Sequence, residues 1–269
     1  MVSGEDQQIP PRTAWGDFPD VLIFSKEMEV KRHPDYAEAK AGDADAATRL
    51  IQDLVTQENV DAFSDLIDGK QPLLVAVHAL EKQGINEIPV ALCTFLADRL
   101  GLPVDSQIIQ ANVVGHTSAD GFTRLAKQAV FDGTVQSGQD YVIVDDFVGQ
   151  GGTLANLKGY IESNGGKVLG SAVLTGRPYS AKLRPDDLRI EELRGKHGQI
   201  ETWWHDQFGF SFNELTESEA RYLCNTKDAD TIRNRVTEKG QAGSPSENEG
   251  SESRVISTAQ GCSEPSNES

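Results

Sequence analysis

The chain has 269 residues, a length that suits one large domain or two small ones. Its 42 acidic and 25 basic residues give a net charge of −17, which argues against nucleic acid or an anionic membrane surface as the main partner. No apolar run approaches the roughly 20 residues of a membrane helix. The N-terminus lacks a basic segment followed by an apolar one, so no signal peptide is expected.

The three cysteines, Cys93, Cys224 and Cys262, lie far apart and form no CxxC pair. Neither a disulfide framework nor a zinc site is therefore indicated. Cys93 falls in an apolar helical pattern, so we expect it to pack in the core. This cysteine usage fits a reducing, cytoplasmic location.

The first 70 residues are interpreted as an N-terminal extension with helices. Residues 1–20 are polar and contain three prolines, which predicts an extended lead-in. The short apolar run 21–24 predicts a strand. Residues 43–68 are rich in helix formers with an apolar stripe, and Asp43 is a candidate cap, so one or two helices are predicted there.

Residues 71–176 show the alternation of an α/β core. Apolar runs predict strands at 72–77, 106–114, 141–146 and 167–175. Helices are predicted between them at 89–103, 122–130 and 154–164. This order of elements predicts a mostly parallel twisted sheet flanked by helices.

The part after the last strand is less regular. The aromatic stretch 201–212 predicts an ordered cover, or hood. Thr216 and Glu219 have the spacing of a capping box, which predicts the start of a helix. We interpret residues 177–239 as this cover with its helices. Residues 240–269 have almost no apolar content, so they are predicted to be a disordered acidic tail.

The stretch VIVDDFVGQGGTL, residues 142–154, lies where function is expected. In a parallel sheet the carboxyl ends of the strands meet at one edge, where ligands bind. Asp145 and Asp146 are expected to leave the pleat at the end of their strand and to turn toward a ligand there. Carboxylates accept hydrogen bonds from hydroxyls and attract Mg²⁺.

The loop behind the two acids has the composition of a phosphate cradle. Gly149, Gly151 and Gly152 let backbone N–H groups converge, and Thr153 can add a hydroxyl and cap the next helix. The N-terminus of a helix favours phosphate. A ligand with a ribose and a 5′-phosphate matches both features. A dinucleotide site is the competing interpretation, but its fingerprint has no acid pair before the glycines.

This stretch resembles the 5-phosphoribosyl-1-pyrophosphate (PRPP) signature of type I phosphoribosyltransferases. Four apolar residues, two acids, a short loop and Gly-Gly-Thr follow one another in that order, and the resemblance extends from about residue 71 to residue 176. It implies an enzyme that uses Mg²⁺ and PRPP to transfer phosphoribose to a nucleobase or an amine, as in purine or pyrimidine salvage within nucleotide metabolism. Members of the family often form dimers, so a homodimer is an expectation.

The resemblance also implies roles for individual residues. Asp145 and Asp146 would bind the ribose hydroxyls and help to organise Mg²⁺. The segment 115–133 would be a mobile flap in which Arg124, with Lys127 nearby, acts as a catalytic cation toward the leaving pyrophosphate. Pyrophosphate would be held by the loop of Val77, His78 and Ala79. The 5′-phosphate would be held by Val148, Gly149, Gln150, Gly151, Gly152 and Thr153.

Two positions depart from the family pattern. Gln150 stands where the family usually has Thr or Ser, and Gly149 stands where hypoxanthine–guanine enzymes carry an acidic base. The loop after Val77 also lacks the usual basic–glycine pair. An alternative function therefore stays open: a regulatory protein that binds PRPP or a nucleotide without catalysis.

Overall fold

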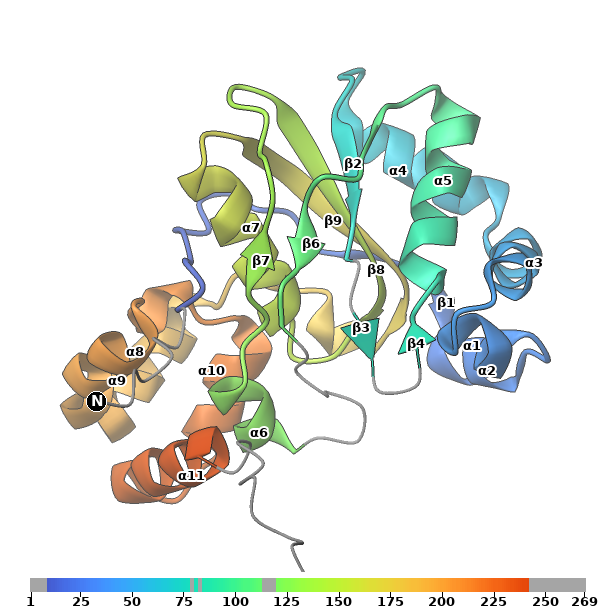
Figure 1. Cartoon of the computed structure of the whole chain (residues 1–269). Helices are drawn as coiled ribbons and strands as arrows, with labels where there is room; N and C mark the ends of the chain where they lie inside the picture. The colour runs from blue at the N-terminus through green and yellow to red at the C-terminus, as the bar shows by residue number, and fades with distance from the viewer. Residues whose placement is uncertain (1–8, 78–79, 82–83, 113–119, 242–269) are drawn as a thin grey trace, which may run out of the picture.

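The computed structural model describes residues 9–77, 80–81, 84–112 and 120–241 (Figure 1). Its centre is a five-stranded sheet in which all neighbouring strands are parallel. The strand order across the sheet is β1 (Leu22–Lys26), β9 (Lys167–Gly176), β8 (Asp140–Val148), β2 (Leu73–Ala76) and β5 (Val104–Asp105). The predicted α/β class, a mostly parallel sheet flanked by helices, is confirmed.

Helices cover both faces of this sheet (Figure 1). One face packs on α3 (Ala44–Leu54), α4 (Gln57–Ile67) and α5 (Ile88–Leu100), and the other on α7 (Gly152–Ser163). Strand β8 supplies both cores by simple alternation. Val142 and Val144 belong to the first, whereas Tyr141 and Ile143 belong to the second. Both faces of the sheet are buried under helices, which explains why the central strands are continuous apolar runs in the sequence.

The N-terminal part is built into the sheet. Strand β1 pairs with β9, and Phe63 of α4 shares a core with Leu174 of β9. Two helices that sequence patterns did not predict, α1 (Glu27–Arg32) and α2 (Tyr36–Lys40), follow β1 directly. Residues on both sides of position 70 therefore form one core, and the division of the chain into four parts stays a prediction.

The segment between α5 and β8 differs from prediction. The expected strand 106–114 is not part of the main sheet. The strand of that sheet that precedes it is β5, which ends at Asp105. The chain turns where Asp105 accepts a hydrogen bond from the Gln107 amide at 2.7 Å. It then forms a separate antiparallel pair of β6 (Ile109–Gln110) with β7 (Phe131–Asp132). The helix expected at 122–130 is α6 (Gly121–Ala126), capped by Asp120.

The loop after β2 contains a short antiparallel pair, β3 (Leu80–Glu81) with β4 (Gly84–Ile85). Only a loop was predicted here. The pair is two residues long on each side, too short to leave a periodic signal in the sequence.

The C-terminal part is a separate group of helices, which we call the helical cluster. It contains α6, α8 (Asp187–His197), α9 (Glu201–Phe208), α10 (Glu217–Cys224) and α11 (Ala229–Gln241). Three single turns lie between or before them: η1 (Pro178–Ser180), η2 (Gly198–Ile200) and η3 (Phe212–Glu214). The indole of Trp204 is fully buried at the centre, with its ring centroid 4.4 Å from that of Phe208.

Two predictions for this region can be compared with the structure. The capping box of Thr216 and Glu219 starts α10, as predicted. The last helix ends at Gln241 rather than at Lys239, and the predicted tail beyond it lies outside the described residues. None of the helices that the structure describes is both long and apolar enough to cross a bilayer.

Candidate functional site

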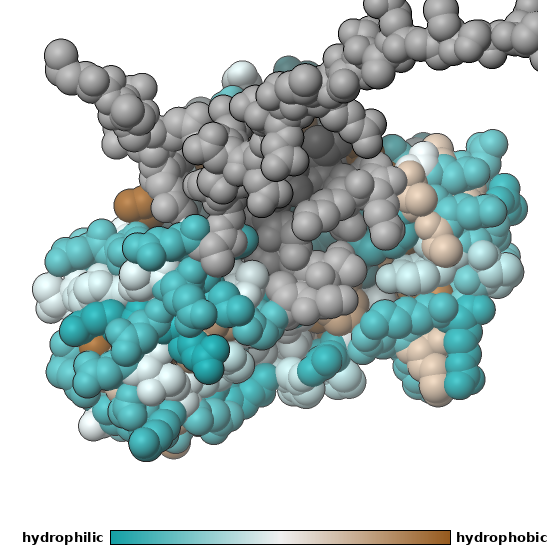
Figure 2. Space-filling view, turned by 60° about the horizontal axis from the view of Figure 1, so that its bottom comes forward, coloured by the Kyte–Doolittle hydropathy of each residue, from teal (hydrophilic) through white to brown (hydrophobic). Residues whose placement is uncertain are grey.

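The strand order fixes where a ligand can enter. From β2 the chain moves to β5 on one side, whereas β8 lies on the other side of β2. This reversal creates a crevice outside the carboxyl ends of β2 and β8. Seen from the side of this edge in Figure 2, the surface of the described residues is mostly hydrophilic. Asp145, Asp146 and Val77 all lie here, and the Val77 amide donates to the Val144 carbonyl at 2.8 Å. His78 and Ala79 lie outside the described residues.

The two acids do not leave the pleat as expected. Strand β8 continues to Val148, so Asp145 and Asp146 are paired residues of the strand and point to opposite faces. The reason is β9, which runs to Gly176 and holds β8 in register to its end, with Val148 opposite Gly176.

Asp145 is buried. Its Oδ1 accepts a hydrogen bond from the Asp146 amide at 2.8 Å. Burial, and then the neighbouring charge of Asp146, raise the pKa of the Asp145 carboxyl well above its ordinary value. A buried carboxyl of this kind is held ready for a partner that offers hydroxyl donors or positive charge.

Asp146 is held by a cation. Its Oδ2 lies 2.8 Å from Nζ of Lys40, which ends α2 on the opposite face of the sheet from α7. Both side chains are mostly covered, with exposed fractions of 13% and 22%. Sequence reasoning missed Lys40, because α2 has only five residues and leaves no periodic pattern. Of the two acids, Asp146 is therefore neutralised by Lys40 from the α2 side of the sheet.

The glycine loop has the geometry of a helix-terminal cradle. Gly151 is the N-cap of α7 with φ 82°, and a Cβ there would lie 2.4 Å from Leu183. Only glycine fits that position. The helix begins at Gly152, so Thr153 does not cap it, contrary to expectation, and no side chain caps α7. The first N–H groups of a helix have no partner within the helix, so an anion at this end would accept hydrogen bonds from them.

The loop also contacts the helical cluster. The Gln150 carbonyl accepts a hydrogen bond from the Thr216 hydroxyl at 2.5 Å, and within the described part Gln150 Oε1 is buried without a hydrogen bond. Arg124 of α6 lies over Gly149, whose added Cβ would meet its Nη1 at 2.6 Å. Burial, and then the charge of Arg177, lower the pKa of Arg124. The structure thus places the Arg124 side chain beside Gly149, whereas its role toward pyrophosphate stays a prediction.

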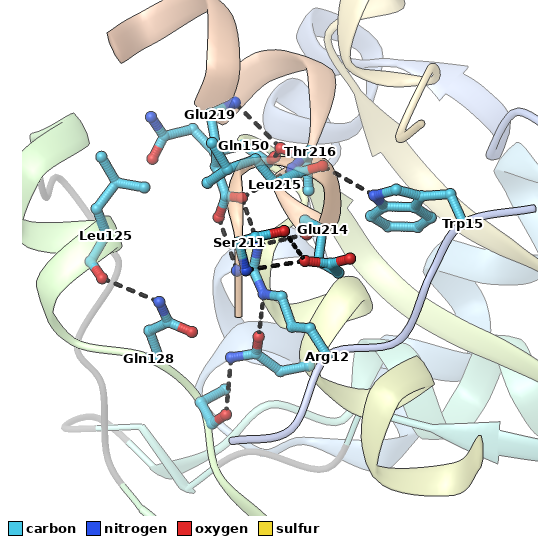
Figure 3. Close-up of polar contacts among 12 residues, drawn as sticks. Arg12, Trp15, Leu125, Gln128, Gln150, Ser211, Glu214, Leu215, Thr216 and Glu219 are labelled. Atoms are coloured by element: carbon cyan, nitrogen blue, oxygen red, sulfur yellow. Dashed lines mark hydrogen bonds and ion pairs between the residues drawn. The ribbon is translucent and has the colours of Figure 1, made fainter. Parts of the chain in front are cut away.

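A buried ion pair lies behind the loop (Figure 3). Arg12 Nη1 is 2.6 Å from Glu219 Oε2, and the two side chains are 1% and 3% exposed. Arg12 also donates to Asn156 of α7 at 2.8 Å and to the Glu214 carbonyl at 3.2 Å. The network joins the N-terminal segment, α7 and α10. Its partners are more than 140 residues apart, so no local pattern signals it.

No preformed metal centre stands among the described residues, because none of their His, Cys, Asp and Glu side chains gather in groups of three or more. A shallow groove runs beside the free edge of β1, lined by Phe24, Lys26, Glu27 and Arg177, among others. It lies beyond β9 from the acid pair. We place the candidate site at β8, where carboxylates, helix N-terminus and arginine meet.

The chain matches none of the known protein-family models. It is 38% identical over 226 residues to "Protein TraN" of Escherichia coli, a match that covers 84% of this chain and 50% of that protein. It is 44% identical over 162 residues to an uncharacterized protein of Haemophilus influenzae, covering 60% of this chain and 36% of that protein. The chain thus spans half or less of the curated relatives it matches.

Among solved structures, the chain overlaps with phosphoribosyltransferases at low scores. Adenine phosphoribosyltransferase from Thermoanaerobacter pseudethanolicus is 23% identical with a TM-score of 0.30, over 45% of this chain and 67% of that one. A second adenine phosphoribosyltransferase is 16% identical with a TM-score of 0.32, over 46% of this chain and 70% of that one. UMP synthase of Leishmania donovani is 14% identical with a TM-score of 0.29, over 66% of this chain and 35% of that one. Scores this low do not support an argument about activity.

Proposed function

We propose that the chain is a Mg²⁺-dependent phosphoribosyltransferase, which transfers phosphoribose from PRPP to a nucleobase or an amine. One observation supports this most. The acid pair of β8 stands at the reversal of strand order, and Gly151, whose left-handed backbone starts α7, follows a few residues later. Carboxylates for a diol and an open helix N-terminus for a phosphate therefore lie within one short stretch.

The parts of PRPP match the groups at this edge. Asp145 and Asp146 point to opposite faces of β8, so both would have to turn to one side to accept hydrogen bonds from the ribose 2′- and 3′-hydroxyls. The N–H groups at the start of α7, with residues 148–153, suit the 5′-phosphate. Arg124 is a fixed cation beside Gly149, suited to stabilising negative charge on leaving pyrophosphate.

The site fits Mg²⁺ only together with its substrate. Magnesium is usually bound by one or two carboxylates plus substrate phosphates, and Asp145 and Asp146 are the two carboxylates near the carboxyl end of β8. When bound, the ion would neutralise charge on the pyrophosphate. The residues of the chain would do the rest: orient the ribose, exclude water and hold the phosphate.

In the reaction, a nitrogen of the acceptor forms a bond to the ribose C1 while the bond from C1 to the pyrophosphate oxygen breaks. Pyrophosphate leaves with the bonding electrons, and the acceptor loses a proton to solvent or to a base. The protein's contribution is positioning and electrostatics, which can lower the barrier without covalent chemistry.

Binding tests the proposal first. Calorimetry with PRPP and Mg²⁺ should give saturable binding to the wild-type chain, weakened at least about tenfold, or about 1.4 kcal/mol, by Asp146→Asn and by Asp145→Asn. Asp140→Asn is the matched control, because Asp140 starts the same strand at its opposite end. Absence of PRPP binding, or equal binding by all variants, would contradict the proposal.

Turnover separates the enzyme from the regulator. Pyrophosphate release is measured with PRPP, Mg²⁺ and a panel of bases and amines. Release with at least one acceptor, lost in Arg124→Gln with PRPP affinity retained, supports the transferase. Tight PRPP binding without release for any acceptor would favour the regulatory alternative instead.

A further inference from the structure

The first residue of α7 lies directly against a carboxylate. A Cβ added to Gly152 would be 2.8 Å from Oε1 of Glu219 and 3.4 Å from Nη2 of Arg12. Glu219 belongs to α10, and Arg12 comes from the N-terminal segment that precedes β1. Gly152 also begins the helix whose N-terminus is proposed to hold the 5′-phosphate. The buried ion pair of Figure 3 therefore lies beside the proposed phosphate site.

The charge of Glu219 is not required by the local structure of α10. Glu219 completes the capping box of this helix, in which it accepts a hydrogen bond from the Thr216 amide at 2.9 Å. Helix α4 has the same capping box with the neutral side chain of Asn59. An uncharged acceptor is therefore enough for a cap, whereas a buried carboxylate adds a desolvation cost that only a partner can offset.

Arg12 is that partner, and other groups hold it in place as well. Its two terminal nitrogens donate to the two oxygens of Glu219 at 2.6 and 2.9 Å, which makes a bidentate pair. Arg12 also donates to Asn156 at 2.8 Å and to the Glu214 carbonyl at 3.2 Å, and its guanidinium lies 4.2 Å from the centre of the Phe210 ring. The guanidinium should therefore keep its position when the charge of Glu219 is removed.

The pair holds two opposite charges next to the place proposed for a third. A phosphate at the N-terminus of α7 would be repelled by a carboxylate without its arginine and attracted by an arginine without its carboxylate. The side chains of Arg12 and Glu219 are 1% and 3% exposed, so salt and water screen these interactions less than at the surface. The charge beside Gly152 thus depends on whether both partners are present.

We propose that Arg12 is a positioning residue of the PRPP site that acts through Glu219. Its charge cancels the carboxylate beside Gly152, so that the start of α7 keeps its affinity for the 5′-phosphate. This inference rests on the proposed function and extends the site to the N-terminal segment. The competing assignment is a mechanical clamp, in which the pair only fastens that segment to α10.

The experiment measures the affinity of the full chain for ribose 5-phosphate and for inorganic phosphate by calorimetry. Glu219→Gln keeps the hydrogen-bond acceptor and removes the negative charge, so both affinities should rise at least about threefold. Arg12→Met leaves the carboxylate without its partner and should lower both at least about tenfold. The double variant Arg12→Met, Glu219→Leu removes both charges and should return to within about threefold of the wild-type chain.

Glu201→Gln is the matched control. Glu201 also accepts two hydrogen bonds from one arginine, Arg194, at 2.8 and 2.9 Å, and its third donor is the Phe212 amide within the helical cluster. This variant should leave both affinities unchanged. Thermal melts check that each variant is folded. If Arg12→Met does not fold, Glu219→Gln and the double variant still decide, because a loosened clamp would lower the affinity in both.

Two results would overturn the inference: an anion affinity of Glu219→Gln equal to or below that of the wild-type chain, or a double variant that binds at least about tenfold more weakly than the wild-type chain. Absence of phosphate binding by the wild-type chain would overturn it too, because there would be no anion for the pair to affect. Failure of the proposed function looks different. Phosphate would then bind with the expected order of variants, while PRPP is not bound or is not turned over, which keeps the role of Arg12 and rejects the transferase.

Discussion

The sheet and the helical cluster are held together in different ways. The sheet is closed by apolar contacts between elements whose patterns are local, such as β8 and α7. The helical cluster has an apolar centre of its own around Trp204, but it meets the sheet through buried polar bonds: Arg12 to Glu219 and Thr216 to Gln150. Apolar packing tolerates small shifts, whereas these bonds have one geometry.

This difference between apolar and polar contacts indicates which of them fixes the position of the glycine loop. The candidate cradle belongs to the sheet by sequence, yet its Gln150 carbonyl is bound by the cluster. A phosphate site must be held within a fraction of an ångström to be useful. The hydrogen bond from the Thr216 hydroxyl therefore fixes the position of the Gln150 carbonyl more closely than apolar packing alone would.

Breaking the buried ion pair should have the largest effect. Arg12→Ala leaves Glu219 charged and buried, which should cost about 3–5 kcal/mol of unfolding free energy. Denaturant melts measure this. Replacing both partners, as Arg12→Met with Glu219→Leu, should recover part of the loss. The control is Arg49→Ala, which breaks a solvent-screened surface pair with Asp35 and should cost far less. Equal losses at the two sites would remove the contrast.

Loss of the Thr216 hydroxyl should have the next largest effect. Thr216→Ala removes the N-cap of α10 and the bond to Gln150, an expected loss of about 1–2 kcal/mol. Thr56→Ala is a matched control, because Thr56 forms the same capping box at α4 with an exposed side chain and no contact with the loop. A PRPP affinity lowered by the first variant alone would locate the function of this hydrogen bond in the cradle.

A smaller effect, and of opposite sign, is expected on the sheet side. The raised pKa of Asp145 means that its carboxyl is protonated more readily in the folded than in the unfolded chain. Stability should therefore fall as the pH rises from the ordinary Asp range through that raised pKa. Asp145→Asn should abolish this fall and raise the melting temperature at neutral pH. A lower melting temperature than wild type would contradict the assignment.

The smallest effect is expected inside the helical cluster. His197 is fully buried, and burial followed by the charge of Lys196 lowers its pKa. The unfolded chain then takes up the proton first, so stability should fall as the pH drops below the ordinary His range. Hydrogen exchange at acidic pH should rise in α8 more than in β8, and His197→Gln should reduce the difference. An equal rise of hydrogen exchange in α8 and β8 would contradict this prediction.

The sheet was predictable because its strands are buried on both faces. Continuous apolar runs led directly to β2, β8 and β9, whereas the ligand site inferred from the acid pair and its glycines stays a prediction. The same rule failed for the run 106–114. Ile108 there is 3% exposed and Ile109 50%, so the segment is half-buried and pairs outside the main sheet, with β7, rather than as a central strand.

The rest of the site could not be read from local patterns. Lys40 reaches Asp146 from a five-residue helix, and Arg12 reaches Glu219 across 207 residues. Hydrogen bonds at such separations depend on the finished fold and leave no spacing in the sequence. The continuation of β8 past its two acids was also hidden, because charged residues normally mark a strand's end.

The position of β1 has a consequence for how the chain reaches its fold. Among the described strands, β1 pairs only with β9, so Leu22 has no strand neighbour until Ala172 is in place. Contacts of such long sequence separation slow folding and leave strand edges exposed meanwhile. Strand β1 is therefore among the last elements of the sheet that can be placed, and a chain interrupted before β9 would leave the edge of LIFSK unpaired and prone to aggregation.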